Sequence, residues 1–127
     1  MNKWNILIVD RQDSWRGSSA TALSRAGYEV YVLDNYEYPP VGVYFDNGPP
    51  DLIILGCASI KREERKFIKT VLADGKNLLV LSASLPWSEM RSLFLQGASD
   101  VTDKTYDPEN LVNIVKESLD NLSLHSK

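Results

Sequence analysis

Short apolar runs bounded by polar residues are the feature that most limits how this chain can fold. They are residues 5–9, 28–33, 51–55 and 77–81, with a shorter fifth run around Val101. Continuous apolar runs of this length, rich in branched side chains, are typical of strands that are buried on both faces of a parallel sheet. The chain is therefore expected to place most of its strands inside the molecule.

Helical periodicity fills nearly all the segments between these runs. In the first, Trp15, Ser19 and Leu23 share one face, and Gly27 stands where a left-handed helix cap is expected. Later helices are predicted to end at Gly75 and Gly97, and a last one to begin at Asp107 and Pro108 and to run to Leu122.

Strands that alternate with helices predict an α/β fold, a doubly wound five-stranded parallel sheet with helices on both faces. Residues 35–50 are the exception, because the four prolines of this segment confine any helix to a turn or two. We therefore expect the second helix region to be remodelled, with Tyr44 and Phe45 folding back on the sheet.

Length and composition are those of one domain. The 127 residues are 43% hydrophobic and 24% charged, which predicts one folded unit over residues 1–122 and a polar tail over 123–127. The charge of −3 argues against nucleic acid or an anionic membrane as a partner of the whole surface. Cys57 is the single cysteine, and with no long apolar segment we expect a cytoplasmic protein.

Polar or small residues follow each apolar run. In open α/β sheets, functional residues lie just outside the carboxyl ends of the strands. The residues at those places are Asp10, Arg11, Gly56, Ser82 and Lys104.

Six landmarks recur in order along the chain: ILIVD at 6–10, GYEV at 27–30, PDLIIL at 50–55, LSA at 81–83, GASDV at 97–101, and Lys104. In these residues the chain resembles the receiver domain of two-component response regulators, over residues 5 to about 120. The resemblance implies the flavodoxin-like receiver fold. It also implies a pocket in which that family transfers a phosphoryl group to an aspartate with the help of Mg²⁺.

The resemblance gives each pocket residue a role. Asp10 matches the first acid of the family, Ser82 the hydroxyl that contacts the phosphoryl group, and Lys104 the ammonium that pairs with it. Gly56 stands where the family has its phosphoacceptor aspartate, and Arg11 where it has its second acid. We therefore expect a vestigial phosphorylation pocket with no catalytic residue, no metal and no cofactor.

The pocket residues and their neighbours also allow interpretations other than phosphoryl transfer. Asp10 and Lys104 are expected to form a structural ion pair, with Arg11 as a second partner of Asp10. A shift of one residue would present the thiolate of Cys57 in place of the nucleophile, although reactivity needs a lowered pKa. The mixed-sign run from Lys61 to Lys66 is expected to be a solvated helix face.

These observations predict a phosphorylation-independent receiver-like signalling domain that is not an enzyme and acts through protein partners, a second copy of the chain being one option. The candidate partner surface comprises Trp87, Val101, Tyr36 and Tyr38. The alternative is a regulatory domain that binds a small anion or a mononucleotide through Arg11, Ser82 and Lys104. Hydroxyls follow the first strand at Ser14, Ser18, Ser19 and Thr21, but the helical stripe spans these positions and no glycine-rich fingerprint is present, which argues against a mononucleotide.

Overall fold

The computed structural model describes residues 4–38, 48–98 and 100–125. Within these residues five parallel strands form one sheet, as the alternating pattern predicts, and their order is β2-β1-β3-β4-β5. The strands are β1 (Asn5–Val9), β2 (Glu29–Leu33), β3 (Leu52–Ser59), β4 (Leu78–Ser84) and β5 (Asp100–Asp103). The β1 strand pairs with both β2 and β3, so its five residues are fully enclosed.

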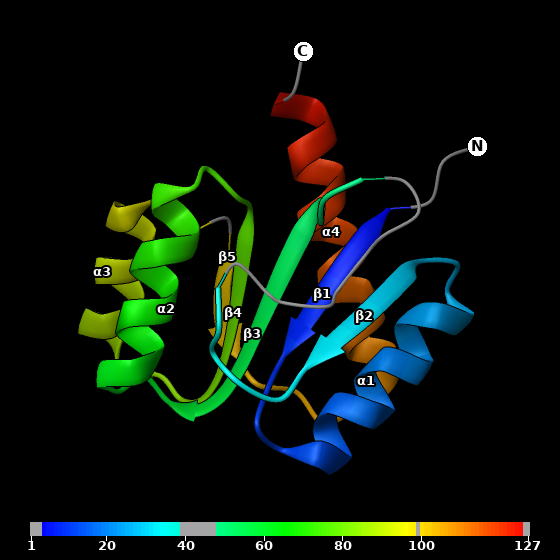
Figure 1. Ribbon diagram of the computed structural model, residues 1–127, viewed down its shortest axis with the longest axis horizontal. Helices are drawn as coiled ribbons and strands as arrows, with labels where there is room; N and C mark the ends of the chain where they lie inside the picture. Colours follow the sequence, from blue (N-terminus) through cyan, green and yellow to red (C-terminus); the bar gives the residue numbers. More distant parts are fainter. Residues whose placement is uncertain (1–3, 39–47, 99, 126–127) are drawn as a thin grey trace.

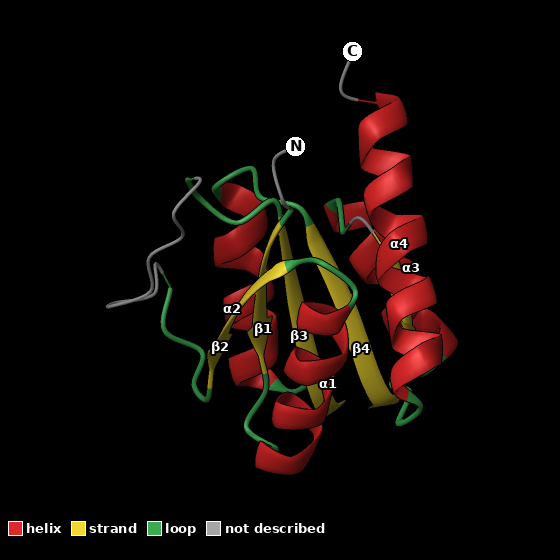
Figure 2. Cartoon of the chain, turned by 90° about the vertical axis from the view of Figure 1, so that its right-hand side faces the viewer, coloured by secondary structure: helices red, strands yellow, loops and turns green. Residues whose placement is uncertain are grey.

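In the described part of the chain, four helices cover the two faces of the sheet (Figure 1). They are α1 (Asp13–Arg25), α2 (Arg62–Ala73), α3 (Trp87–Gln96) and α4 (Pro108–His125). Figures 1 and 2 show α1 beside α4 on one face, while α2 and α3 lie on the other. Since α4 continues to His125, the first three residues of the predicted polar tail are helical.

Two apolar cores fill the spaces between the sheet and its helices. Ile8, Ile54 and Leu81 pack with α1 and α4, whereas Val9 and Leu55 face α2 and α3. Neighbouring residues of one strand thus point to opposite faces, which explains why the central strands read as continuous apolar runs. Within the described residues, no helix is long and apolar enough to cross a membrane.

Helix α3 ends as its sequence predicts. Gly97 adopts a positive φ of 103°, where a side chain would be strained, and the backbone of Gly97 and Ala98 bonds the last carbonyls of the helix.

The connection after β2 contains no helix in its described residues, 34–38 and 48–51. Tyr36 and Tyr38 instead lie against Phe67 of α2, with ring centroids 5.7 and 6.2 Å from that of Phe67. The predicted packing of Tyr44 and Phe45 lies outside the described residues.

Candidate functional site

The carboxyl ends of four strands bring the predicted pocket residues together. Strand register places Val9 beside Leu55, so Asp10 follows next to Gly56. The backbone N–H of Lys104 donates to the carbonyl of Ser82 at 2.9 Å, which places the lysine at the end of β4. One edge of the sheet therefore brings Asp10, Gly56, Ser82 and Lys104 close to one another.

Asp10 and Lys104 form the expected buried ion pair. The Lys104 Nζ lies 2.8 Å from Asp10 Oδ2, and the two residues are 9% and 2% exposed. The ammonium also donates to Gln12 Oε1 at 2.8 Å, and the backbone N–H of Gln12 donates to Asp10 Oδ1 at 2.8 Å. Two buried charges are thus compensated within the chain, and the lysine is already occupied.

Trp15 closes the pocket from the start of α1. Its ring is buried, its Nε1–H donates to the carbonyl of Thr105 at 2.7 Å, and the Lys104 ammonium lies 4.7 Å from a ring centroid of the indole. The periodicity of α1 had suggested only a core role for this residue. Its position in the first turn of the helix that follows Asp10 was the signal that it could reach the pocket.

Gly56 has no room for a side chain. A Cβ atom at this position would lie 2.4 Å from Asp10 Oδ2 and 2.7 Å from Cζ3 of Trp15, closer than real Cβ contacts. The space in which a side chain of residue 56 would begin is therefore filled by Asp10 and Trp15. The close approach of these two side chains requires glycine here.

Arg11 is not a second partner of Asp10, contrary to the expectation. Its guanidinium forms an ion pair with Glu63 and lies 4.3 Å from the ring centroid of Tyr36. The hydrogen bond with Glu63 raises the pKa of Arg11. The physical reason is that Asp10 is satisfied by Lys104, while Arg11, the next residue, extends toward α2.

Strands β3 and β4 run further than the apolar runs predicted. Gly56 and Ser82 were expected to follow the strands, but pairing continues to Ser59 and Ser84. Ser82 is fully buried and its hydroxyl donates to the carbonyl of Ser84 at 2.7 Å. The hydroxyl is therefore used inside the sheet.

Cys57 lies opposite Ser82 in the strand register and is buried. Burial, the main cause, raises the pKa of the Cys57 thiol to about 11, with a smaller opposing effect from a hydrogen bond to Ser82. The thiol is therefore protonated at neutral pH, which argues against the reactive thiolate considered from the sequence.

The raised pKa of Cys57 predicts a loss of stability at alkaline pH. The unfolded thiol loses its proton near pH 9, whereas the folded thiol keeps it to about pH 11, so the unfolding free energy falls across this window. In the Cys57→Ala variant, the unfolding free energy should therefore decrease by about 2 kcal/mol less between pH 9 and pH 11 than in the original chain. Urea unfolding at pH 8, 9, 10 and 11 under reducing conditions measures it. Parallel pH profiles for the two proteins would contradict the prediction.

Magnesium binding is not supported by the residues present. Mg²⁺ prefers several oxygen ligands, often carboxylates, but Asp10 is the only acid of the predicted set and is paired with Lys104. No group of three His, Cys, Asp or Glu side chains that could hold a metal occurs in residues 4–38, 48–98 and 100–125.

The predicted partner-surface residues differ in exposure. Trp87 is 71% exposed and shares α3 with Leu95, which is 78% exposed. Val101 is only 4% exposed, because it packs in the core beneath α3, so its side chain is not available to a partner. Tyr36 and Tyr38 are half-buried, and Tyr38 donates its hydroxyl to Asp74 at 2.6 Å.

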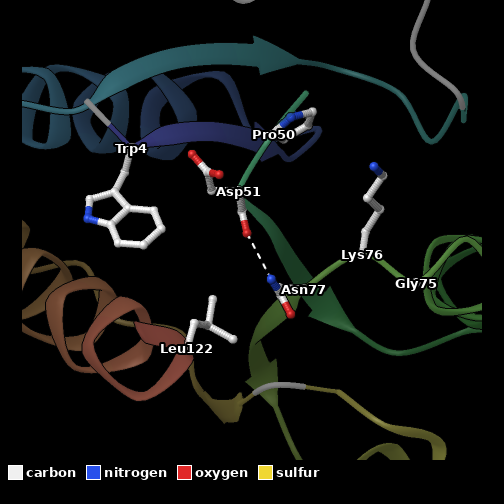
Figure 3. A pocket seen from close by; sticks show the side chains of 7 residues that line it. All are labelled: Trp4, Pro50, Asp51, Gly75, Lys76, Asn77 and Leu122. Carbon is white, nitrogen blue, oxygen red and sulfur yellow. Dashed lines mark hydrogen bonds between the residues drawn. The ribbon is translucent and has the colours of Figure 1, made fainter. Parts of the chain in front are cut away.

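A groove of about 460 Å³ lies at the opposite, amino edge of the sheet (Figure 3). Its polar groups hold strands together: Asn77 Nδ2 donates to the carbonyl of Asp51 at 3.1 Å, and the Asp51 carboxylate accepts the backbone N–H of Asn5 at 2.7 Å. The polar side chains of the groove are therefore explained by their role in joining neighbouring strands. It is lined by Trp4, Pro50, Asp51, Gly75, Lys76, Asn77 and Leu122.

Comparison with known proteins finds the same architecture in solved structures. A response regulator receiver domain protein from Methanospirillum hungatei superposes with a TM-score of 0.79 at 20% identity, covering 98% of this chain and 99% of that one. A response regulator from Desulfuromonas acetoxidans gives 0.75 at 25% identity, covering 94% and 98%.

The chemotaxis protein CheY4 of Vibrio cholerae gives a TM-score of 0.76 at 20% identity, covering 92% of this chain and 99% of that one. No family model and no curated protein sequence matches the chain. Superposition with these TM-scores across nearly the whole of each chain shows that this chain has the fold of a response regulator receiver domain.

Proposed function

We propose that the chain is a receiver-like domain of two-component signalling that works without phosphorylation, through protein–protein interaction. The observation that carries this proposal is Gly56, which offers no oxygen to a phosphoryl group and, in this pocket, has no space for a longer side chain. Phosphoryl transfer to a receiver needs a carboxylate nucleophile.

The remaining pocket residues support the same proposal. A lysine that contacts a phosphoryl group must be free to move toward it, but Lys104 is held by Asp10 and Gln12. Ser82 donates its hydroxyl to Ser84. Because these groups satisfy one another, the pocket resembles a closed polar network more than a reaction site, which supports a non-enzymatic role.

Exposed apolar side chains on α3 support a role in protein interaction. Trp87 and Leu95 stand largely in solvent on the same short helix, and the guanidinium of Arg91 lies 5.6 Å from a ring centroid of Trp87. Tryptophan and arginine are the residue types that most often dominate binding energy at interfaces. Trp87 therefore stays in the proposed partner surface, whereas Val101 is removed from it.

The alternative of small-anion binding has less support. The three groups proposed to hold an anion are each engaged inside the chain: Arg11 by Glu63, Lys104 by Asp10, and Ser82 by Ser84. A free anion would have to break these contacts and desolvate the same groups again.

Small phosphodonors are expected to leave the chain unmodified. After incubation with acetyl phosphate and Mg²⁺, intact-mass spectrometry should show the unmodified mass, because residue 56 offers no carboxylate. A receiver domain known to accept phosphoryl groups serves as the positive control in the same buffer. A phosphoryl adduct that hydroxylamine removes, on Asp10 or any other carboxylate, would refute the proposed function.

A further inference from the structure

The mouth of the vestigial pocket is framed by two tyrosines and a lysine. A cavity of about 430 Å³ opens here, and Tyr36, Lys61 and Tyr106 are among its lining residues. Tyr36 also lines an adjoining groove of about 410 Å³, together with Lys66. The two hollows therefore form one continuous surface beside α2.

Among the described residues that line this surface, the charges outside ion pairs are those of Lys61, Lys66 and the buried Glu64, so two exposed cations stand against one buried carboxylate. Lys104 is paired with Asp10 and Arg11 with Glu63. The Glu64 carboxylate accepts the backbone N–H of Lys61 at 3.0 Å. No described acid forms an ion pair with the Lys61 or Lys66 ammonium. A partner that presents carboxylates would complement these two charges.

Tyr106 is 63% exposed on a connection that is itself firmly held. The carbonyl of Thr105 accepts the Trp15 indole N–H, and the Thr105 hydroxyl accepts the backbone N–H of Asp107 at 3.2 Å and the side-chain amide of Asn110 at 3.1 Å. The residues on either side of the ring are thus fixed. An exposed tyrosine on a preorganised loop loses little entropy when a partner covers it.

We propose that the surface formed by Tyr36, Lys61, Lys66 and Tyr106 binds an acidic segment of a partner protein. This inference rests on the proposed function, since it names the partner chemistry that such a domain would use. A free anion such as phosphate fits this surface less well. Arg11 and Lys104 are already in ion pairs, so a small anion would meet only the single charge of Lys61 or of Lys66. A peptide segment adds contacts with both tyrosine rings.

The test is a nuclear magnetic resonance titration of the full chain with an acetylated, amidated Asp-Glu-Leu-Asp-Glu peptide. Saturable shifts are expected at the backbone amides of Lys61 and Tyr106, and they should weaken as salt is raised. The neutral Asn-Gln-Leu-Asn-Gln peptide is the matched ligand control and should give no saturable shifts there. Inorganic phosphate forms a separate arm.

Charge reversal locates the site. Lys61→Glu should weaken binding of the acidic peptide about fivefold or more, because an attraction becomes a repulsion. Lys69→Glu makes the same charge change within α2, the helix that Lys61 precedes, beside a different groove with Leu72 and Gln96, and should change the affinity by less than about twofold. A Tyr106→Ser variant should also bind more weakly.

Three results would overturn the inference: no saturable shift with the acidic peptide, equal binding of the neutral peptide, or equal losses from Lys61→Glu and Lys69→Glu. If phosphate produces the same shifts with the same affinity, the surface is a small-anion site instead. None of these results shows whether the chain accepts a phosphoryl group. Intact-mass spectrometry after incubation with acetyl phosphate tests that separately. The two proposals can therefore fail separately.

Discussion

Gly56→Asp is expected to destabilise the fold strongly, by on the order of 4 kcal/mol, and to leave the chain unable to accept phosphate. The new Cβ would lie 2.7 Å from the ring of Trp15 and 2.4 Å from Asp10 Oδ2, so the ring or the strand must shift. The variant also places a second carboxylate beside a buried one. Both overpacking and the burial of a repelling charge act in the same direction.

Urea unfolding at pH 7 measures this effect, and Gly17→Asp is the matched control. A Cβ at Gly17 meets no atom within 4 Å, and the residue lies exposed on α1, so this variant should change the unfolding free energy by less than about 1 kcal/mol. If Gly56→Asp is no more destabilising than Gly17→Asp, the steric role of Trp15 is wrong.

Trp15→Ala gives a second check on the same contact. Alone it should destabilise the chain by about 3–5 kcal/mol, because a buried ring is lost. Combined with Gly56→Asp it removes the ring atoms that the new Cβ would meet and leaves only the contact with Asp10 Oδ2, so the double variant should be more stable than the sum of the single effects predicts. Arg11→Asp should give no such relief, since Arg11 lies on Glu63 and Tyr36.

Local pattern was sufficient to predict most of the fold. The runs at 5–9, 51–55 and 77–81 became the central strands because a strand covered on both faces must be apolar at every position. Gly75 and Gly97 ended their helices, since both adopt the positive φ that glycine tolerates best. Strand ends were less well predicted: β3 continues for four residues past Leu55, because β4 continues beside it.

The contents of the pocket were only partly predictable. Which residues meet at the sheet edge follows from topology, so Asp10 and Lys104 could be paired in advance. The directions of Arg11 and Trp15 could not, because each depends on partners distant in sequence, Glu63 for the arginine and Thr105 for the indole. Val101 illustrates the same limit. The sequence placed it on a partner surface, but α3 packs over β5 and buries its side chain.

Removal of the Lys104 charge is the second change expected to have a large effect. Lys104→Met keeps a long apolar side chain in place but leaves Asp10, at 2% exposure, without its counter-charge. Breaking a buried pair from one side costs about 3–5 kcal/mol, because the remaining ion stays desolvated. The same substitution at exposed Lys69 should change the unfolding free energy by less than about 0.5 kcal/mol.

A double-mutant cycle with Asp10→Asn separates the ion pair from packing. If the two side chains stabilise the fold mainly through each other, Asp10→Asn with Lys104→Met should be more stable than the sum of the single losses by about 1–3 kcal/mol. Additive losses, or a Lys104→Met variant as stable as Lys69→Met, would show that the pair does not hold the pocket closed. A large coupling would instead mean that Lys104 stabilises the fold mainly by compensating the charge of the buried Asp10.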